Sequence, residues 1–199
     1  MSTDTQECLL DAAEALFLER GFAATSLRSV ASRADANLAA THYHFGSKRG
    51  LFEAVIHRRV TPVNEARLTN LDALEADASK KQMKVEQILR AFLEPLMNEN
   101  AVNLAALIER IFSEPPAVTR SMLENEFGEI IERYTSALGK VLPNLPAEEL
   151  HWRFHFLVGG MLQAIRLDSP IAGPGVTGPE KFEQLIAYAS AGFRAPSIG

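Results

Sequence analysis

The segment 28–48 carries residue types that suit contact with DNA. Arg28 can donate paired hydrogen bonds to a guanine edge, and the small Ala39 and Ala40 allow close approach to a thymine methyl group. A lysine at a helix start, as at Lys48, opposes the helix dipole, which makes sense where a phosphate lies close to both. The alternative is an ordinary solvated polar face. The candidate DNA-binding residues are Arg28, Asn37, Leu38, Ala39, Ala40, His42, Tyr43, His44 and Lys48.

The pattern around these residues predicts the elements that position them. Residues 26–33 have the one-sided apolar spacing of a short amphipathic helix. Residues 34–36 form a turn, and Asn37 is a good N-cap for a second short helix. Gly46 breaks that helix, and Ser47 caps the helix that follows. Two short helices joined by a tight turn predict a helix-turn-helix, whose second helix enters a DNA major groove.

The charge distribution supports a basic module on an acidic protein. The chain has 199 residues, of which 47% are hydrophobic, and a formal net charge of −5. Residues 21–60 contain six basic and two acidic side chains, a balance of +4, so the remainder carries −9. This composition predicts a folded chain with a sizeable core and places any DNA contact on the basic segment.

The cysteine count and the N-terminus indicate the compartment. Cys8 is the one cysteine, so no disulfide can form within the chain, which fits a reducing cytoplasm. The first ten residues lack the basic start and apolar run of a signal peptide. No apolar stretch reaches the length of a membrane span. We therefore expect a cytoplasmic protein with no membrane partner.

The rest of the chain predicts further helices and no strand. Apolar residues recur at helical spacing over residues 5–20, from residue 48 through Pro62, and over 84–98, 101–113, 117–141, 147–167 and 180–193. Proline at position 62 predicts a kink rather than an end, because the apolar pattern resumes beyond it. The predicted fold class is all-α, with a three-helix DNA-binding domain over residues 1–47 and a larger helical domain over residues 48–199.

The stretches TSLRSVASRA (residues 25–34) and NLAATHYHFGSKRGLF (37–52) closely resemble the TetR family of bacterial transcriptional regulators. FLERGF at residues 17–22 resembles the same family. The second half is similar to members that respond to fatty acids or acyl thioesters, on the strength of VLPNLPAEEL (141–150) and HWRFHFLVGG (151–160).

The resemblance implies a homodimer that binds a pseudo-palindromic double-stranded DNA operator. Tyr43 and Lys48 would hold the DNA backbone, while Arg28 and residues 37–42 would approach the bases. The larger domain would bind a ligand and dimerise through a four-helix interface. The chain departs from the family pattern at Asp35, where glycine is usual, and at Ala40 and Thr41. Aspartate tolerates a left-handed conformation, so we expect the turn to survive.

Polar residues that interrupt apolar helices indicate where a ligand could bind. Arg110 could pair with an acid group of a ligand or with a nearby glutamate, and the apolar candidates are equally consistent with plain core. The candidate ligand-binding residues are Phe92, Leu96, Leu104, Ile108, Arg110, Phe112, Met122, Phe127, Trp152, His155, Phe156 and Gln163. His151 and His155 lack a third metal ligand, so no metal site and no cofactor are predicted.

Two adjacent glycines inside a helix indicate a close helix–helix approach. Gly159 and Gly160 cost about 1 kcal/mol each relative to alanine. We expect a dimer interface there, or the wall of a pocket beside it. The candidate dimer-interface residues are Leu157, Gly160, Met161, Leu185, Ile186 and Ala189.

The leading hypothesis is a ligand-responsive transcriptional regulator, a repressor that leaves its operator when a small apolar effector, such as a fatty acid or acyl thioester, binds. One alternative is a DNA-binding protein that responds to no ligand. Another is an all-helical enzyme acting on an apolar substrate, but no paired carboxylates, nucleophile elbow, phosphate loop or metal set is present in the sequence. The prediction is therefore that the protein is not an enzyme.

Overall fold

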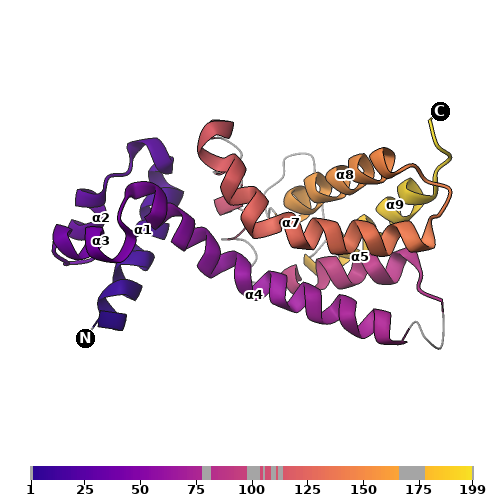
Figure 1. Ribbon diagram of the computed structural model, residues 1–199, viewed down its shortest axis with the longest axis horizontal. Helices are drawn as coiled ribbons and strands as arrows, with labels where there is room; N and C mark the ends of the chain where they lie inside the picture. Colours follow the sequence, from indigo (N-terminus) through magenta and orange to yellow (C-terminus); the bar gives the residue numbers. More distant parts are fainter. Residues whose placement is uncertain are drawn as a thin grey trace. The chain divides into compact units, whose positions relative to one another are not determined.

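The computed structural model describes residues 2–77, 82–97, 104, 106–108, 111, 114–165 and 178–198, and every regular element in these ranges is helical. This confirms the predicted all-α fold class. The elements, drawn in Figure 1, are α1 (Ser2–Ala24), α2 (Leu27–Arg33), α3 (Leu38–Phe45), α4 (Lys48–Asp77), α5 (Val85–Leu93), the 3-10 turn η1 (Glu94–Leu96), α7 (Pro116–Val141), α8 (Ala147–Ile165) and α9 (Gly178–Arg194). No described helix combines the length and apolar character needed to cross a bilayer.

The chain divides into two compact units, and the first division lies inside α4. The first unit comprises Met1–Thr61 and Ala106–Glu126, and the second comprises Pro62–Ala105 and Phe127–Gly199. The first compact unit therefore extends past the predicted boundary before Lys48, as far as Thr61. The reason is that the first turns of α4 belong to the core of the first unit, where the Phe52 ring lies 4.9 Å from the Phe17 ring and 5.0 Å from the Phe22 ring.

Local capping signals define the helix ends of the first unit. Ser26 accepts a hydrogen bond from the Ser29 amide, and the Ser29 hydroxyl accepts one from the Ser26 amide, which is a capping box. Asn37 accepts a bond of 2.9 Å from the Ala39 amide, as its predicted role as N-cap requires. Ser47 accepts one from the Gly50 amide at the start of α4. These bonds satisfy amides that have no partner within the helix.

Three residues with positive φ angles make the sharp changes of direction. Gly21 has φ 78° and interrupts the helical conformation just after the predicted helix over residues 5–20, although α1 resumes and continues to Ala24. Asp35 has φ 48°, which confirms that aspartate serves in the turn where the family usually has glycine. Gly46 has φ 68° and ends α3. The turn and the orientation of α3 are therefore encoded locally.

The second unit has a core of large apolar side chains from several helices. It is built from α4 beyond Pro62, α5, the second part of α7, α8 and α9, which run alongside one another in Figure 1. Helix α4 continues through Pro62, as the apolar pattern predicted. Tyr134 is fully buried, and its hydroxyl donates a 2.8 Å hydrogen bond to the Arg67 carbonyl oxygen. Core residues include Leu71, Ile88, Leu89, Phe92, Leu93, Leu138, Phe154, Leu157, Ile186 and Phe193.

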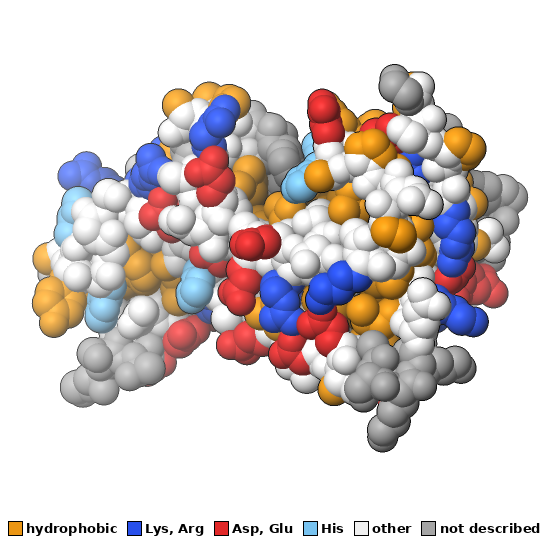
Figure 2. Space-filling model, turned by 45° about the vertical axis from the view of Figure 1, so that its right-hand side comes forward, with side chains coloured by type: hydrophobic (Ala, Val, Ile, Leu, Met, Phe, Trp, Pro, Cys, Tyr) orange, Lys and Arg blue, Asp and Glu red, His pale blue; other side chains and the backbone are white. Residues whose placement is uncertain are grey.

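Ion pairs on the surface of this unit join α9 to α5. The Arg194 guanidinium donates two bonds of 2.6 Å to the Glu86 carboxylate and lowers the pKa of Glu86 to about 2. Arg90 forms a second paired contact with Glu183. Figure 2 shows acidic and basic side chains adjacent on this unit. Much of the acidic charge counted in the sequence is therefore compensated locally.

Candidate nucleic-acid interface

Helix α3 presents a polar face to solvent. Asn37, Ala39, His42 and Tyr43 are exposed, and Tyr43 reaches 84% exposure. The remaining candidates on α3, namely Leu38, Ala40 and His44, are half-buried at the edges of this face. An exposed polar helix face after a helix-turn-helix turn is the geometry that enters a major groove.

Two further side chains complete this surface. Arg28 is exposed on α2, and among the described residues no carboxylate pairs with it. The ring nitrogen Nδ1 of His42 lies 3.2 Å from the Gly46 carbonyl oxygen, which can only accept, so Nδ1 carries the proton. The other ring nitrogen of His42 makes no described protein contact. The recognition surface is defined here as Arg28, Asn37, Ala39, His42 and Tyr43.

Thr41 lies on the buried side of α3, away from the recognition surface, and its hydroxyl group has no described hydrogen-bond partner. It is fully buried, and its Oγ1 finds no hydrogen-bond partner within the described part of the chain. A buried hydroxyl without a partner costs about 1–3 kcal/mol. We expect Thr41→Val to raise the free energy of unfolding by about 1 kcal/mol, because valine keeps the branched shape and removes the polar atom. Urea denaturation followed by circular dichroism measures this change.

The matched control is Thr135→Val on α7. Thr135 is also buried, but its hydroxyl donates a 2.6 Å bond to the Ile131 carbonyl oxygen, so valine should give no gain there. A Thr41→Val protein that is less stable than the wild type would contradict the assignment of an orphaned hydroxyl.

Lys48 has a structural role that the sequence analysis did not foresee. Its ammonium group donates to the carbonyl oxygens of Phe22 (2.8 Å), Ala23 (3.2 Å) and Thr25 (2.9 Å), and it lies 4.3 Å from the centre of the Phe22 ring. These bonds use all three N–H donors of the ammonium. Lys48 therefore closes the carbonyl end of α1, because a cation is stabilised where helix carbonyls lack partners, and its phosphate contact stays a prediction.

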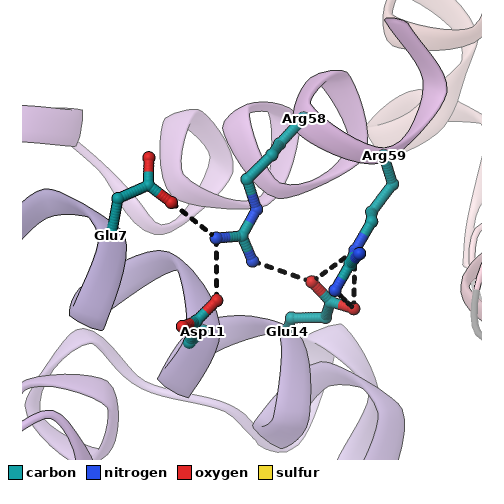
Figure 3. A network of polar contacts seen from close by, with 5 residues as sticks. All are labelled: Glu7, Asp11, Glu14, Arg58 and Arg59. Carbon is teal, nitrogen blue, oxygen red and sulfur yellow. Dashed lines mark hydrogen bonds and ion pairs between the residues drawn. The ribbon is translucent and has the colours of Figure 1, made fainter. Parts of the chain in front are cut away.

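Most of the basic charge counted near the helix-turn-helix is paired within the first unit. Arg58 contacts Glu7, Asp11 and Glu14, and Arg59 contacts Glu14 as well (Figure 3). Arg33 pairs with Glu19, and Arg49 pairs with Glu53. The excess of +4 over residues 21–60 disappears because the carboxylates of α1 lie outside that window. Arg28 is the arginine of this segment that takes part in none of these described ion pairs.

The predicted ligand-binding residues do not form one group. Phe92 and Leu96 are buried in the core of the second unit, with Leu104 packed against it, and Phe127 is half-buried. Ile108 and Met122 are buried in the first unit. Arg110 and Phe112 lie outside the described residues. The predicted pocket therefore stays a prediction for the members in the second unit.

The two apolar faces of α8 differ in burial within the subunit. Trp152, His155, Phe156 and Gln163 are exposed, with Trp152 at 56% and Phe156 at 66%, so they do not line an internal pocket of the subunit. The predicted dimer-interface residues Leu157, Met161, Ile186 and Ala189 are instead buried in the core, and Leu185 packs against it. The sequence could not separate the faces because both are apolar.

Close packing against Leu185 accounts for one of the two adjacent glycines in α8, Gly160. A Cβ atom at Gly160 would lie 2.8 Å from Leu185 Cδ1, which is closer than real Cβ contacts allow. The close helix approach predicted from this glycine is therefore the packing of α8 on α9 within one subunit. A Cβ at Gly159 would meet no atom within 4 Å.

One residue that the sequence analysis missed is Arg67, which is 4% exposed. It lies three residues after Asn64 and four before Leu71, both buried, so it occupies an inward position of α4. That spacing is the signal that could have identified it.

An all-helical chain with an exposed polar recognition helix belongs to the class of helix-turn-helix transcriptional regulators. The family model of the bacterial regulatory proteins of the tetR family matches residues 9–55, and the model of the tetracyclin repressor-like C-terminal domain matches residues 88–192. The chain therefore belongs to the TetR family, as the sequence motifs predicted. Members of this family are transcriptional regulators and not enzymes.

Two named relatives match part of the chain. A probable HTH-type transcriptional regulator, YttP of Bacillus subtilis, is 38% identical over 56 residues, which is 28% of this chain and 27% of YttP. The HTH-type transcriptional repressor BepR of Brucella suis is 33% identical over 93 residues, which is 47% of this chain and 43% of BepR. The chain thus matches less than half the length of either relative.

Solved structures share the fold over almost the whole chain. A TetR-like regulator from Rhodococcus sp. RHA1 has a TM-score of 0.64 at 21% identity, covering 96% of this chain and 97% of the other. The multidrug binding protein EbrR, complexed with imidazole, has a TM-score of 0.58 at 21% identity, with 97% of each chain covered. These likenesses establish the fold alone.

Proposed function

We propose that the protein is a homodimeric transcriptional repressor that binds a pseudo-palindromic operator and is released by a small apolar effector. The observation that carries the proposal is the recognition surface on α2 and α3, which combines exposed polar side chains with an unpaired arginine. Arg28 and Asn37 are suited to base edges, and Tyr43 is suited to a phosphate. The repressor assignment is supported by the name of BepR.

We infer that the dimer forms through exposed faces of α8 and α9. Trp152 and Phe156 on α8 and Tyr188 on α9 are at least half exposed in the subunit. Few monomeric proteins leave several large aromatic side chains in water, because burying them is favourable. Glycines at positions 159 and 192 have open space where a Cβ would lie, which allows a partner helix to approach.

The effector is proposed to bind in the second unit, where Phe92, Leu96 and Phe154 supply apolar contact area. Support comes from the multidrug binding protein EbrR, whose structure has the same fold and holds a small molecule. Release requires only that the ligand binds better to the form that does not bind DNA, with a coupling of about 1–3 kcal/mol. The protein would act in the cytoplasm, where its operator lies.

The test is binding of purified protein to duplexes that tile the DNA upstream of its own gene. We expect one duplex to bind tightly and its affinity to fall steeply with salt, because phosphate contacts release counterions. Arg28→Ala should weaken specific binding by about 1–3 kcal/mol per half-site, and Tyr43→Phe should weaken binding to all sequences. Fluorescence anisotropy at three salt concentrations measures both.

The control is Arg90→Ala, which removes an exposed arginine from α5 in the second unit. This variant should bind DNA as the wild type does. Specific binding that survives the loss of Arg28 unchanged would contradict the proposed surface, and the absence of salt-dependent binding to any duplex would contradict autoregulation.

A further inference from the structure

Arg67 is a buried arginine surrounded by apolar and aromatic side chains of the second unit. Its guanidinium carbon lies 4.0 Å from the centre of the Phe92 ring, and the Phe92 ring packs at 5.1 Å against both Tyr134 and Phe154. Met161 on α8 lies on another side, with its sulfur 3.4 Å from one terminal nitrogen. A permanent positive charge therefore lies in the core, where side chains are normally neutral.

The described acceptors around Arg67 are all uncharged. Its Nε donates to the Phe92 carbonyl oxygen at 2.9 Å, and one terminal nitrogen donates to Asn64 Oδ1 at 3.2 Å. The other terminal nitrogen reaches only the Met161 sulfur, which is a poor acceptor. The guanidinium has five N–H donors, and no carboxylate of the described ranges contacts it. Burial consequently lowers the pKa of Arg67 to about 10.

This arrangement costs stability, so a function for the buried charge would explain why an arginine is present. Burying an ion without a counterion is unfavourable, and replacing buried charges with apolar side chains of similar volume is often neutral or stabilising. A methionine or leucine could fill the space between α4, α5 and α8 without this cost. Arg90 and Arg194 of the same unit, by contrast, have carboxylate partners and lie at the surface.

We propose that Arg67 binds the carboxylate of the effector, so that the effector is an organic acid with an apolar body. This inference rests on the proposed function. A planar guanidinium matches a carboxylate with two parallel hydrogen bonds. One positive charge in an apolar setting fits a monoanion, whereas a phosphate dianion would leave a buried negative charge uncompensated. Phe92, Phe154 and Met161 supply the apolar contacts for the rest of the ligand.

The Met161 side chain can move to make room for a carboxylate oxygen next to the guanidinium. Methionine is unbranched and flexible, so the Met161 sulfur can turn away from the guanidinium at low cost when a carboxylate oxygen replaces it. Arg67 also lies on α4, which begins at Lys48 and directly follows the recognition helix α3 in the sequence. A ligand that binds Arg67 therefore acts on the helix that both units share.

The experiment compares acids with their alcohols on the full chain. Octanoate and 4-phenylbutyrate are titrated against 1-octanol and 4-phenyl-1-butanol while the melting temperature is recorded. We expect at least one acid to raise the midpoint by roughly 3–6 °C at about ten times its dissociation constant, and its alcohol to raise it far less. Equal shifts from each acid and its alcohol, or no shift from either acid, would overturn the proposal.

Two variants separate ligand binding from bracing of the fold. Arg67→Met should melt at or above the wild-type temperature and lose the response to acids, and Arg67→Lys should keep a weakened response because the charge remains. Arg90→Met is the matched control and should respond as the wild type does. An Arg67→Met protein that keeps the full acid response would overturn the proposal.

Operator binding is measured in parallel, so that failure of this inference is distinct from failure of the proposed function. Operator binding without any acid-specific shift would overturn the role of Arg67 and leave the repressor standing. An acid-specific shift in a protein that binds no upstream duplex would support the anion site and overturn the repressor.

Discussion

Replacing both Trp152 and Phe156 with glutamate is expected to make the protein monomeric and to weaken operator binding by about 100-fold or more. The two side chains are largely exposed in the subunit, so the new charges lie in water and should not disturb its core. In a dimer they would be buried opposite like charges, which is unfavourable. A monomer loses the gain that comes from linking two half-site contacts, which is commonly 10²–10⁴-fold.

Analytical ultracentrifugation measures the subunit mass, and fluorescence anisotropy measures the operator affinity. Ile131→Glu is a suitable control because Ile131 is an exposed apolar residue on α7, outside α8 and α9. That variant should remain dimeric and bind DNA normally. A double variant that stays dimeric at micromolar concentration would show that the dimer uses another surface.

Replacing Glu14 with alanine is expected to lower the free energy of unfolding of the first unit by about 2–4 kcal/mol. The Glu14 carboxylate is only 6% exposed and accepts hydrogen bonds of 2.8–2.9 Å from Arg58 and Arg59 (Figure 3). Without it, Arg58 keeps only the exposed partners Glu7 and Asp11, and among the described residues its Nε already has no acceptor. Arg59 loses its one described carboxylate partner, and breaking an ion pair whose carboxylate is buried is the expensive case.

Glu7→Ala provides the matched control because Glu7 contacts the same arginine. Its side chain is 56% exposed, so we expect a loss below about 1 kcal/mol. Hydrogen exchange of peptides from residues 1–61 measures the stability of this unit separately from that of the second. The exchange rate of these peptides should increase strongly in Glu14→Ala and not in Glu7→Ala. Equal effects of the two substitutions would mean that burial of Glu14 contributes nothing.

Local signals in the sequence determined most of the DNA-binding unit. The caps at Ser26 and Asn37, the left-handed Asp35 and the helix-ending Gly46 all act within a few residues of themselves. A hydrogen bond between residues two or three apart, or a φ angle that one residue tolerates, can be inferred from residue types alone. The helix-turn-helix and its exposed face were therefore predictable.

Long-range contacts decided which cations have partners within the protein. Lys48 meets carbonyl oxygens more than twenty residues away, and Arg58 meets carboxylates more than forty residues away. A count of charges along a window of sequence cannot include partners from another helix. The tertiary structure was needed to show that these cations have partners within the protein, whereas Arg28 has no carboxylate partner among the described residues.

The sequence by itself determined an all-helical regulator with a helix-turn-helix, because helical periodicity, capping and turn residues are local properties. Only the tertiary structure decided which apolar face of α8 is core and which is exposed. Phe154 and Phe156 are equally apolar, yet one is buried against Phe92 of α5 and the other is in water, because only one side of α8 faces the core. The same packing turned Arg67 inward, where its charge lies without a carboxylate of the described chain.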